Sequence, residues 1–100
     1  MSVDLIEDKE TKTVIKKPDN YVVVILNDDF TTFDCVIYVL VEIFHKNVEE
    51  AHQIAYDVHE KGKGIAGGPF QYDVAETKAS VAMDIAKEME MPLKLFVERA

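Results

Sequence analysis

The sequence predicts a small two-layer α+β domain, in which three helices pack on one face of a three-stranded, antiparallel-type sheet. The predicted order is strand, helix, helix, strand, helix, strand (β-α-α-β-α-β). The first strand is a run of β-branched and apolar residues, Val22 to Leu26, that ends abruptly in polar residues. Three later segments carry apolar residues at helical spacing, and breaks at Gly62–Pro69 and at Pro92 separate them from strand-like runs. One hundred residues, 48% of them hydrophobic, suit one such core.

Composition narrows the classes of function. The net charge of −8 disfavours nucleic acid and anionic membranes as partners, because both select positive surface. The single cysteine, Cys35, excludes an internal disulfide and a multi-cysteine zinc site. No apolar run approaches the roughly 20 residues that cross a bilayer, and residues 1–8 lack the features of a signal peptide. We therefore expect a cytoplasmic protein, and a monomer.

A polar turn joins the first strand to the first helix. The range Asn27–Asp29 follows the strand directly, and Thr31 is followed three residues later by Asp34. That spacing is typical of a threonine cap with an acidic partner at a helix start. Apolar residues then recur at helical spacing, which predicts an amphipathic helix from Thr32 to about His45.

The second helix is predicted to begin at Asn47, with Glu50 completing a capping box, and to end before Gly62. His59 lies at the border of its apolar face, near the helix end. The residues that make that face are Ala51, Ile54, Ala55 and Val58. The glycine-rich run after the helix matches no phosphate-binding loop, and it predicts an irregular edge strand running to about Tyr72.

The third helix is predicted from a further capping box, Asp73 with Glu76, and to run to about Met91. Its predicted core stripe is Val74, Val81, Ile85 and Met89. Pro92 ends the helix, and Leu93 to Val97 is the predicted last strand. Residues 1–20 have no sustained apolar period, so we expect a flexible N-terminal extension before a core domain at 21–100.

Asn27, Asp28, Asp29 and His59 are the candidates for chemistry. Paired carboxylates with a histidine could bind a metal or serve as acid and base in hydrolysis. Each residue also has an ordinary structural explanation: the first three as a turn that bonds its own backbone, and His59 as a border residue satisfied by a carbonyl or water. A third possibility uses them together. An ammonium group has three donors and no acceptor, and an amide oxygen, a carboxylate and a neutral imidazole nitrogen would satisfy it.

Four motifs in order resemble the ClpS family of adaptor proteins, over the chain from about Tyr21 to Ala100. They are Asn27-Asp28-Asp29-Phe30-Thr31, Val58-His59-x-x-Gly62-Lys63, Val74-Ala75-Glu76-Thr77-Lys78 and Pro92-Leu93. The resemblance implies a non-enzymatic N-end rule adaptor with no cofactor or metal. Such an adaptor binds proteins whose first residue is Leu, Phe, Tyr or Trp, and it delivers them to the AAA+ unfoldase of the Clp protease, ClpA or ClpC.

The resemblance also implies three groups of site residues. The ligands of the α-amino group are Asn27, Asp28, Asp29 and His59, with Asp29 favoured over Asp28 for the direct carboxylate. The pocket for the first side chain is lined by Leu26, Thr31, Phe33, Val36, Ala55, Val58 and Leu93. The surface that docks on the unfoldase's N-terminal domain includes Asp73, Glu76 and Lys78. The N-terminal extension corresponds to the segment that engages the unfoldase during delivery.

Two departures from the family pattern affect the pocket. Phe33 stands where better-known members carry a methionine at the rim, and Ala55 stands where another methionine is common on the second helix. One change adds bulk and the other removes it, so the preference among Leu and the aromatic residues is open. An alternative class is an interaction domain resembling the C-terminal domain of the ribosomal stalk protein, which binds by a helix face and needs no such pocket.

Overall fold

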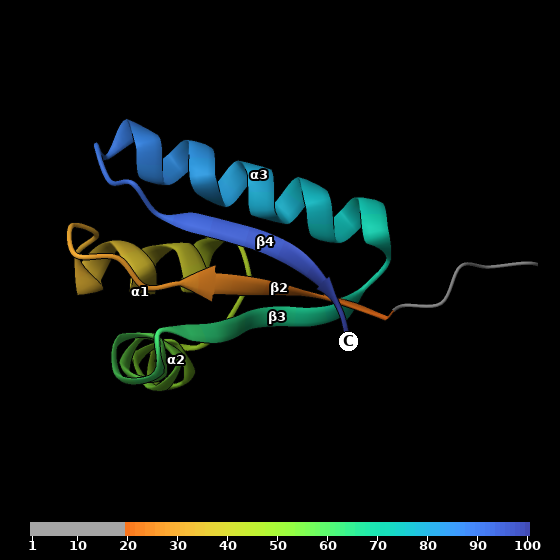
Figure 1. The fold of residues 1–100 in the computed structure, drawn as a ribbon, viewed down its shortest axis with the longest axis horizontal. Coiled ribbons are helices and arrows are strands. Elements are labelled where there is room, and N and C mark those ends of the chain that lie inside the picture. The colour runs from red at the N-terminus through yellow and green to blue at the C-terminus, as the bar shows by residue number, and fades with distance from the viewer. Residues whose placement is uncertain (1–19) are drawn as a thin grey trace, which may run out of the picture.

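The computed structural model describes residues 20–100, and the N-terminal extension expected before them lies outside the described residues. Within that range the elements follow one another in the predicted order (Figure 1). They are β2 (Tyr21–Leu26), α1 (Phe33–Glu42), α2 (Val48–Lys61), β3 (Lys63–Phe70), α3 (Tyr72–Glu88) and β4 (Lys94–Arg99).

The sheet has the strand order β3-β2-β4, and both pairings are antiparallel. Val23 lies opposite Val97, and Ile25 lies opposite Leu95. The pairing of β2 with β3 contains register shifts on either side of Val23, so β3 is an irregular edge strand, as predicted. At Gly68, φ is +127° and a Cβ atom would lie 2.8 Å from a backbone oxygen, so this position requires glycine.

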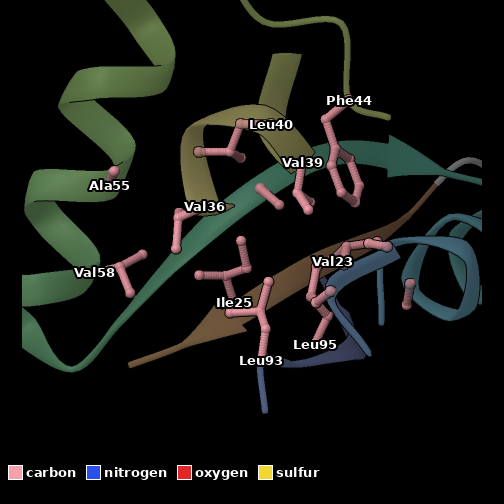
Figure 2. Close-up of a cluster of buried hydrophobic side chains, with 14 of the residues drawn as sticks. Val23, Ile25, Val36, Val39, Leu40, Phe44, Ala55, Val58, Leu93 and Leu95 are labelled. Atoms are coloured by element: carbon pink, nitrogen blue, oxygen red, sulfur yellow. The ribbon is translucent and has the colours of Figure 1, made fainter. Parts of the chain in front are cut away.

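One hydrophobic core lies between the sheet and the three helices (Figure 2). Alternate residues of β2, Val23 and Ile25, are both 0% exposed and belong to this core, as does Leu95 of β4. Because side chains alternate across a strand, these residues share one face of the sheet. The helices contribute buried residues to the same cluster, which confirms the two-layer α+β prediction.

Helix α3 meets the core through alanines, and the predicted stripe of larger residues was wrong. The exposed fractions of Val74, Val81 and Met89 are 43%, 40% and 40%, and Ile85 is half-buried. The buried residues of the helix are Ala75, Ala79, Ala82 and Ala86. Small side chains let a helix lie close to the layer beneath it, so the stripe with the least bulk faces the sheet.

The helix starts and ends agree with the sequence only in part. Asn47 and Glu50 form the predicted capping box, and Gly62 ends α2 with φ of 89°. Helix α1 is capped by Thr32 rather than Thr31, through a hydrogen bond of 3.1 Å from the Cys35 N–H. Helix α3 begins after Gln71 with no side-chain cap, so the predicted capping box there was also wrong.

Two helices are shorter than predicted, because the chain turns into the left-handed region just beyond them. Helix α1 ends at Glu42, and His45 has φ of 57°. Helix α3 ends at Glu88, and Glu90 has φ of 63°. None of the helices formed by residues 20–100 is both long and apolar enough to cross a membrane.

Candidate functional site

A pocket of about 350 Å³ lies where the end of β2 meets α1 and α2. Three segments line it: the turn after β2, the first turns of α1 and the second half of α2. The lining residues are Asn27, Asp28, Asp29, Thr31, Phe33, Val36, Ala55, Val58 and His59. The structure therefore brings together nine of the eleven residues that the sequence assigned to the amino-group site and its pocket.

One backbone hydrogen bond explains how the two polar parts of this pocket meet. The N–H of Asn27 donates to the carbonyl oxygen of Gly62, at 2.9 Å. The last pair of the β2–β3 ladder, Leu26 with Lys63, lies beside it. Since Gly62 is the cap of α2, this bond holds the turn after β2 against the end of α2. His59, three residues before the cap, is consequently placed at the same pocket as Asn27.

Asp28 organises the turn rather than facing outward. Its Oδ1 accepts hydrogen bonds from the N–H groups of Phe30 and Thr31, at 2.8 and 2.7 Å, and its Oδ2 accepts one from Thr31 Oγ1, at 2.6 Å. Partial burial disfavours the charged form, but the hydrogen bonds from Thr31 and Phe30 outweigh it and lower the pKa of Asp28. The turn that the sequence offered as the ordinary explanation is therefore present at Asp28.

Asn27, Asp29 and His59 make up the remaining polar part of the lining. All three are exposed, and within residues 20–100 their side chains have no hydrogen-bond partner. Together they offer an amide oxygen, a carboxylate and an imidazole nitrogen at the edge of one pocket. This set accepts hydrogen bonds from a group that carries several N–H donors.

The floor of the pocket is apolar. Val36 of α1 and Ala55 and Val58 of α2 are 7%, 3% and 3% exposed, and they lie at one end of the core, between the two helices (Figure 2). Thr31 and Phe33 complete the lining at the start of α1. The polar set and the apolar floor share one hollow, so a ligand with an amino group beside a hydrophobic body would use both.

Two residues that the sequence assigned to the pocket, Leu26 and Leu93, are not among the side chains that surround this hollow. Leu93 is 4% exposed and is part of the hydrophobic core. Leu26 is half-buried at the end of β2, opposite Lys63 and Lys94. Their assignment to the pocket stays a prediction, because Val36, Ala55 and Val58 are buried to a similar degree as Leu93 and still line the hollow.

The structure gives little support for a hydrolytic active site at these residues. Cys35, the only cysteine, is 0% exposed. Its burial, followed by the charge of Asp28, raises the pKa of the thiol, which makes it a poor nucleophile. Within the described part of the chain, no three His, Cys, Asp or Glu side chains converge as a metal site would require.

One pocket neighbour was missed by the sequence. The ring of Phe33 lies 5.9 Å, centroid to centroid, from the ring of His52 on α2, with 52° between the planes. His52 was not among the candidates from the sequence, and its helical spacing to Ala55 was the signal that could have placed it beside the pocket.

The three residues assigned to the docking surface lie in the first turns of α3 and line two neighbouring hollows. Asp73 and Lys78 line a depression at the start of α3, together with Val74 and Thr77. Glu76 lines a different groove, between α3 and β4. Its carboxylate accepts a hydrogen bond from Tyr72, and this bond raises the pKa of the Tyr72 phenol.

Lys78 also has a structural contact. Its Nζ donates a hydrogen bond of 3.0 Å to the carbonyl oxygen of Ile43, at the end of α1. The same ammonium lies 5.9 Å from the ring centroid of Phe44 and 5.5 Å from that of Phe70. Lys78 therefore links α3 to α1 and β3 in addition to lining the depression.

Comparisons with known proteins agree on one family. Residues 16–96 match the family model described as ATP-dependent Clp protease adaptor protein ClpS. A protein from Acetivibrio thermocellus, described as ATP-dependent Clp protease adapter protein ClpS, is 44% identical over 98 residues, which cover 98% of either chain. One of the same description from Myxococcus xanthus is 44% identical over 94 residues, or 94% of this chain and 87% of the relative.

A solved structure gives the same result. The structure of Agrobacterium tumefaciens ClpS2 bound to L-phenylalaninamide superposes with a TM-score of 0.78 at 32% sequence identity. The match covers 84% of this chain and 100% of the Agrobacterium chain. The similarity therefore extends over the whole sheet-and-helix domain.

Proposed function

This chain belongs to the ClpS family of ATP-dependent Clp protease adaptors, and on that premise we propose that it is an N-end rule adaptor. It binds the free N-terminus of proteins that begin with Leu, Phe, Tyr or Trp, and it delivers them to a Clp AAA+ unfoldase, ClpA or ClpC, for degradation. The adaptor itself catalyses no reaction, and it acts as a cytoplasmic monomer.

The observation that carries this proposal is the single pocket in which an acceptor set borders an apolar floor. Asn27, Asp29 and His59 receive the α-amino group, whose three N–H donors match an amide oxygen, a carboxylate and a neutral imidazole nitrogen. The first side chain enters between Val36 and Ala55. In the Agrobacterium neighbour the ligand, L-phenylalaninamide, combines a free amino group with a benzyl side chain, which is the combination this pocket suits.

Asp28 and Asp29 take different roles in the proposal. Both oxygens of Asp28 already accept hydrogen bonds from Phe30 and Thr31. Asp29 is exposed at the pocket and has no such partner within the described residues, so it is the carboxylate that meets the ammonium. Asp28 holds the turn that presents it.

Affinity then has two parts, and selectivity needs both. Burying a Leu or Phe side chain contributes about 1.5 to 3 kcal/mol. Each charge-assisted hydrogen bond to the ammonium contributes about 1.5 to 3 kcal/mol before ordering costs are subtracted. An internal Leu lacks the ammonium and an N-terminal Ser lacks the apolar body, so few chain ends satisfy both requirements.

For delivery, the depression lined by Asp73 and Lys78 is the surface that meets the N-terminal domain of the unfoldase. It lies at the start of α3 and shares no lining residue with the peptide pocket. Substrate and unfoldase can therefore be held at the same time. Glu76, in its separate groove, lies at the margin of this contact.

A peptide titration tests the proposal. We would measure the Kd for a fluorescent peptide that begins with Phe, for the same peptide acetylated at its N-terminus, and for the same peptide with Ser placed before the Phe. Tight binding of the first peptide alone is expected, because the other two have no ammonium beside the apolar side chain. Equal affinity for the acetylated peptide would overturn the amino-group site. Failure of all three to bind would overturn the proposed function.

A further inference from the structure

Phe33 and His52 form a small aromatic surface at one side of the pocket mouth. Phe33 starts α1, lines the pocket and is still 42% exposed, and His52 on α2 is exposed as well. Their ring centroids are 5.9 Å apart, so the two rings bridge the helices beside the hollow. Part of the Phe33 ring is thus available to a ligand that is larger than one side chain.

This surface lies away from the amino-group ligands. His52 and His59 are on the same helix, two turns apart, which corresponds to roughly 10 Å along its axis. Ala55, in the pocket floor, lies between them along the helix. A chain whose ammonium is held near His59 and whose first side chain enters at Ala55 therefore has the Phe33–His52 surface on the far side of the pocket from its own N-terminus.

We infer that Phe33 and His52 form a second subsite, which favours a flat aromatic side chain at position 2 of the bound chain. This inference rests on the proposed function, because it needs the N-terminus to be held at Asn27, Asp29 and His59. An extended residue spans roughly 3.5 Å, so the second Cα lies about 5 Å from the ammonium. An aromatic side chain covers the remaining distance to the two rings.

The chemistry of the surface favours an aromatic ring over an aliphatic chain. Two rings that meet at 52° leave both edge and face positions for a third ring. Val48, 58% exposed and one helical turn before His52, extends the apolar strip away from the pocket. We therefore expect Trp at position 2 to strengthen binding about three- to tenfold over Ser, the range typical of one added aromatic contact.

The test compares two peptides, Phe-Trp and Phe-Ser followed by the same residues, across four proteins: the parent chain, Phe33→Leu, His52→Gln and Tyr38→Leu. The readout is the ratio of the two Kd values, so any effect of Phe33→Leu on the first side chain cancels. Tyr38 is the matched control, an aromatic on α1 that is 49% exposed and does not line the pocket.

The expected result is a ratio of about three to ten in the parent and in Tyr38→Leu, falling toward one in Phe33→Leu and in His52→Gln. A ratio of one in the parent, with both peptides bound, would overturn the second subsite and leave the proposed function standing. A ratio that persists in both Phe33→Leu and His52→Gln would also overturn it. If neither peptide bound to the parent chain, the proposed function would be overturned, and the second subsite with it.

Discussion

Alanine has opposite consequences in two helix contacts of this molecule. In the α3 seam, where α3 meets the sheet, alanines allow the helix to lie close against the strands. In the α1–α2 seam, where the first turns of α1 face the second half of α2, Ala55 borders an open pocket. Ala55 is 3% exposed and Ala82 is 0% exposed, so burial alone does not distinguish the two positions.

The difference lies in what approaches each alanine from the opposite side. In the α3 seam the facing layer is a continuous sheet, which fills the space that the short side chain leaves. In the α1–α2 seam the facing residues are Val36 and the polar turn after β2. The turn is fixed by its bond to Gly62 and by the internal bonds of Asp28. A short side chain there leaves a binding site.

The largest effect is expected from a substitution that disrupts the packing in the α3 seam. Ala82→Leu inserts three carbons where the helix and sheet are in contact, so we expect the free energy of unfolding to fall by about 1–3 kcal/mol. Denaturant unfolding measures it. The control is Val81→Leu, at the neighbouring position that is 40% exposed, which should change stability little. Equal stability of Ala82→Leu and the parent would mean that the seam has spare room.

The same insertion in the α1–α2 seam should affect binding instead of stability. Ala55→Leu places the added carbons in the pocket, so we expect the free energy of unfolding to stay within about 0.5 kcal/mol of the parent, the range of substitutions that disturb no packing. Affinity for a Phe-starting peptide should fall about tenfold, or ~1.4 kcal/mol. Calorimetric titration measures the affinity. A variant that lost stability as Ala82→Leu does, with affinity retained, would show that no pocket exists at Ala55.

A third prediction concerns the link between the two regions. Lys78→Met keeps the apolar stem but loses the hydrogen bond to the Ile43 carbonyl and the contacts with the Phe44 and Phe70 rings. We expect a loss of about 1 kcal/mol in the free energy of unfolding. Asp73→Asn, in the same depression, is the control and should leave stability unchanged. Weaker unfoldase binding by both variants, with a stability loss only in Lys78→Met, would separate the docking role from the structural one.

The smallest expected effect is in the polar turn of the α1–α2 seam. Asp28→Asn keeps one acceptor but loses the charge that strengthens three hydrogen bonds, so we expect a loss of about 0.5–1 kcal/mol. Since folding lowers the pKa of Asp28, the unfolded chain takes up this proton first as the pH falls. The contribution is therefore present above the ordinary value of 3.8, and it is lost as the pH falls below that value through the folded pKa.

Denaturant unfolding of the parent and Asp28→Asn at neutral pH and in acid measures this contribution. The difference in unfolding free energy should shrink in acid, once Asp28 is protonated in both states of the parent. A difference that is constant with pH would show that the carboxylate charge does not hold the turn.

The order of elements could be predicted from the sequence because its signals are local. Asn47 with Glu50 and the glycine at 62 specify the two ends of α2 through hydrogen bonds within a few residues, and both were predicted correctly. The core face of α3 could not be predicted in this way. One face of that helix carries alanines and another carries larger apolar residues. Hydrophobic periodicity favoured the face with Val74 and Val81, because larger apolar side chains count as more hydrophobic. The distance to the sheet decides which stripe is buried, and that distance is a tertiary property.

The polar part of the candidate site could be predicted from the sequence, because few residue types can accept hydrogen bonds from an ammonium group. Amide, carboxylate and imidazole groups near apolar residues pointed to Asn27, Asp28, Asp29 and His59, and the structure places all four at one pocket. What the sequence could not predict was the neighbour of Phe33. The contact between Phe33 and His52 depends on how α1 and α2 are aligned, which no local signal in the sequence specifies.

The bond from the Asn27 N–H to the Gly62 carbonyl has a consequence for folding kinetics. It closes a loop that contains both α1 and α2, and contacts between residues so far apart in the sequence are a slow class to form. We expect that a partly folded molecule, in which this bond is absent, does not hold Asn27 and His59 together for an amino terminus. Ligand binding thus reports that the chain has completed its fold, and an incompletely folded copy would not compete with finished ones for the same ligands.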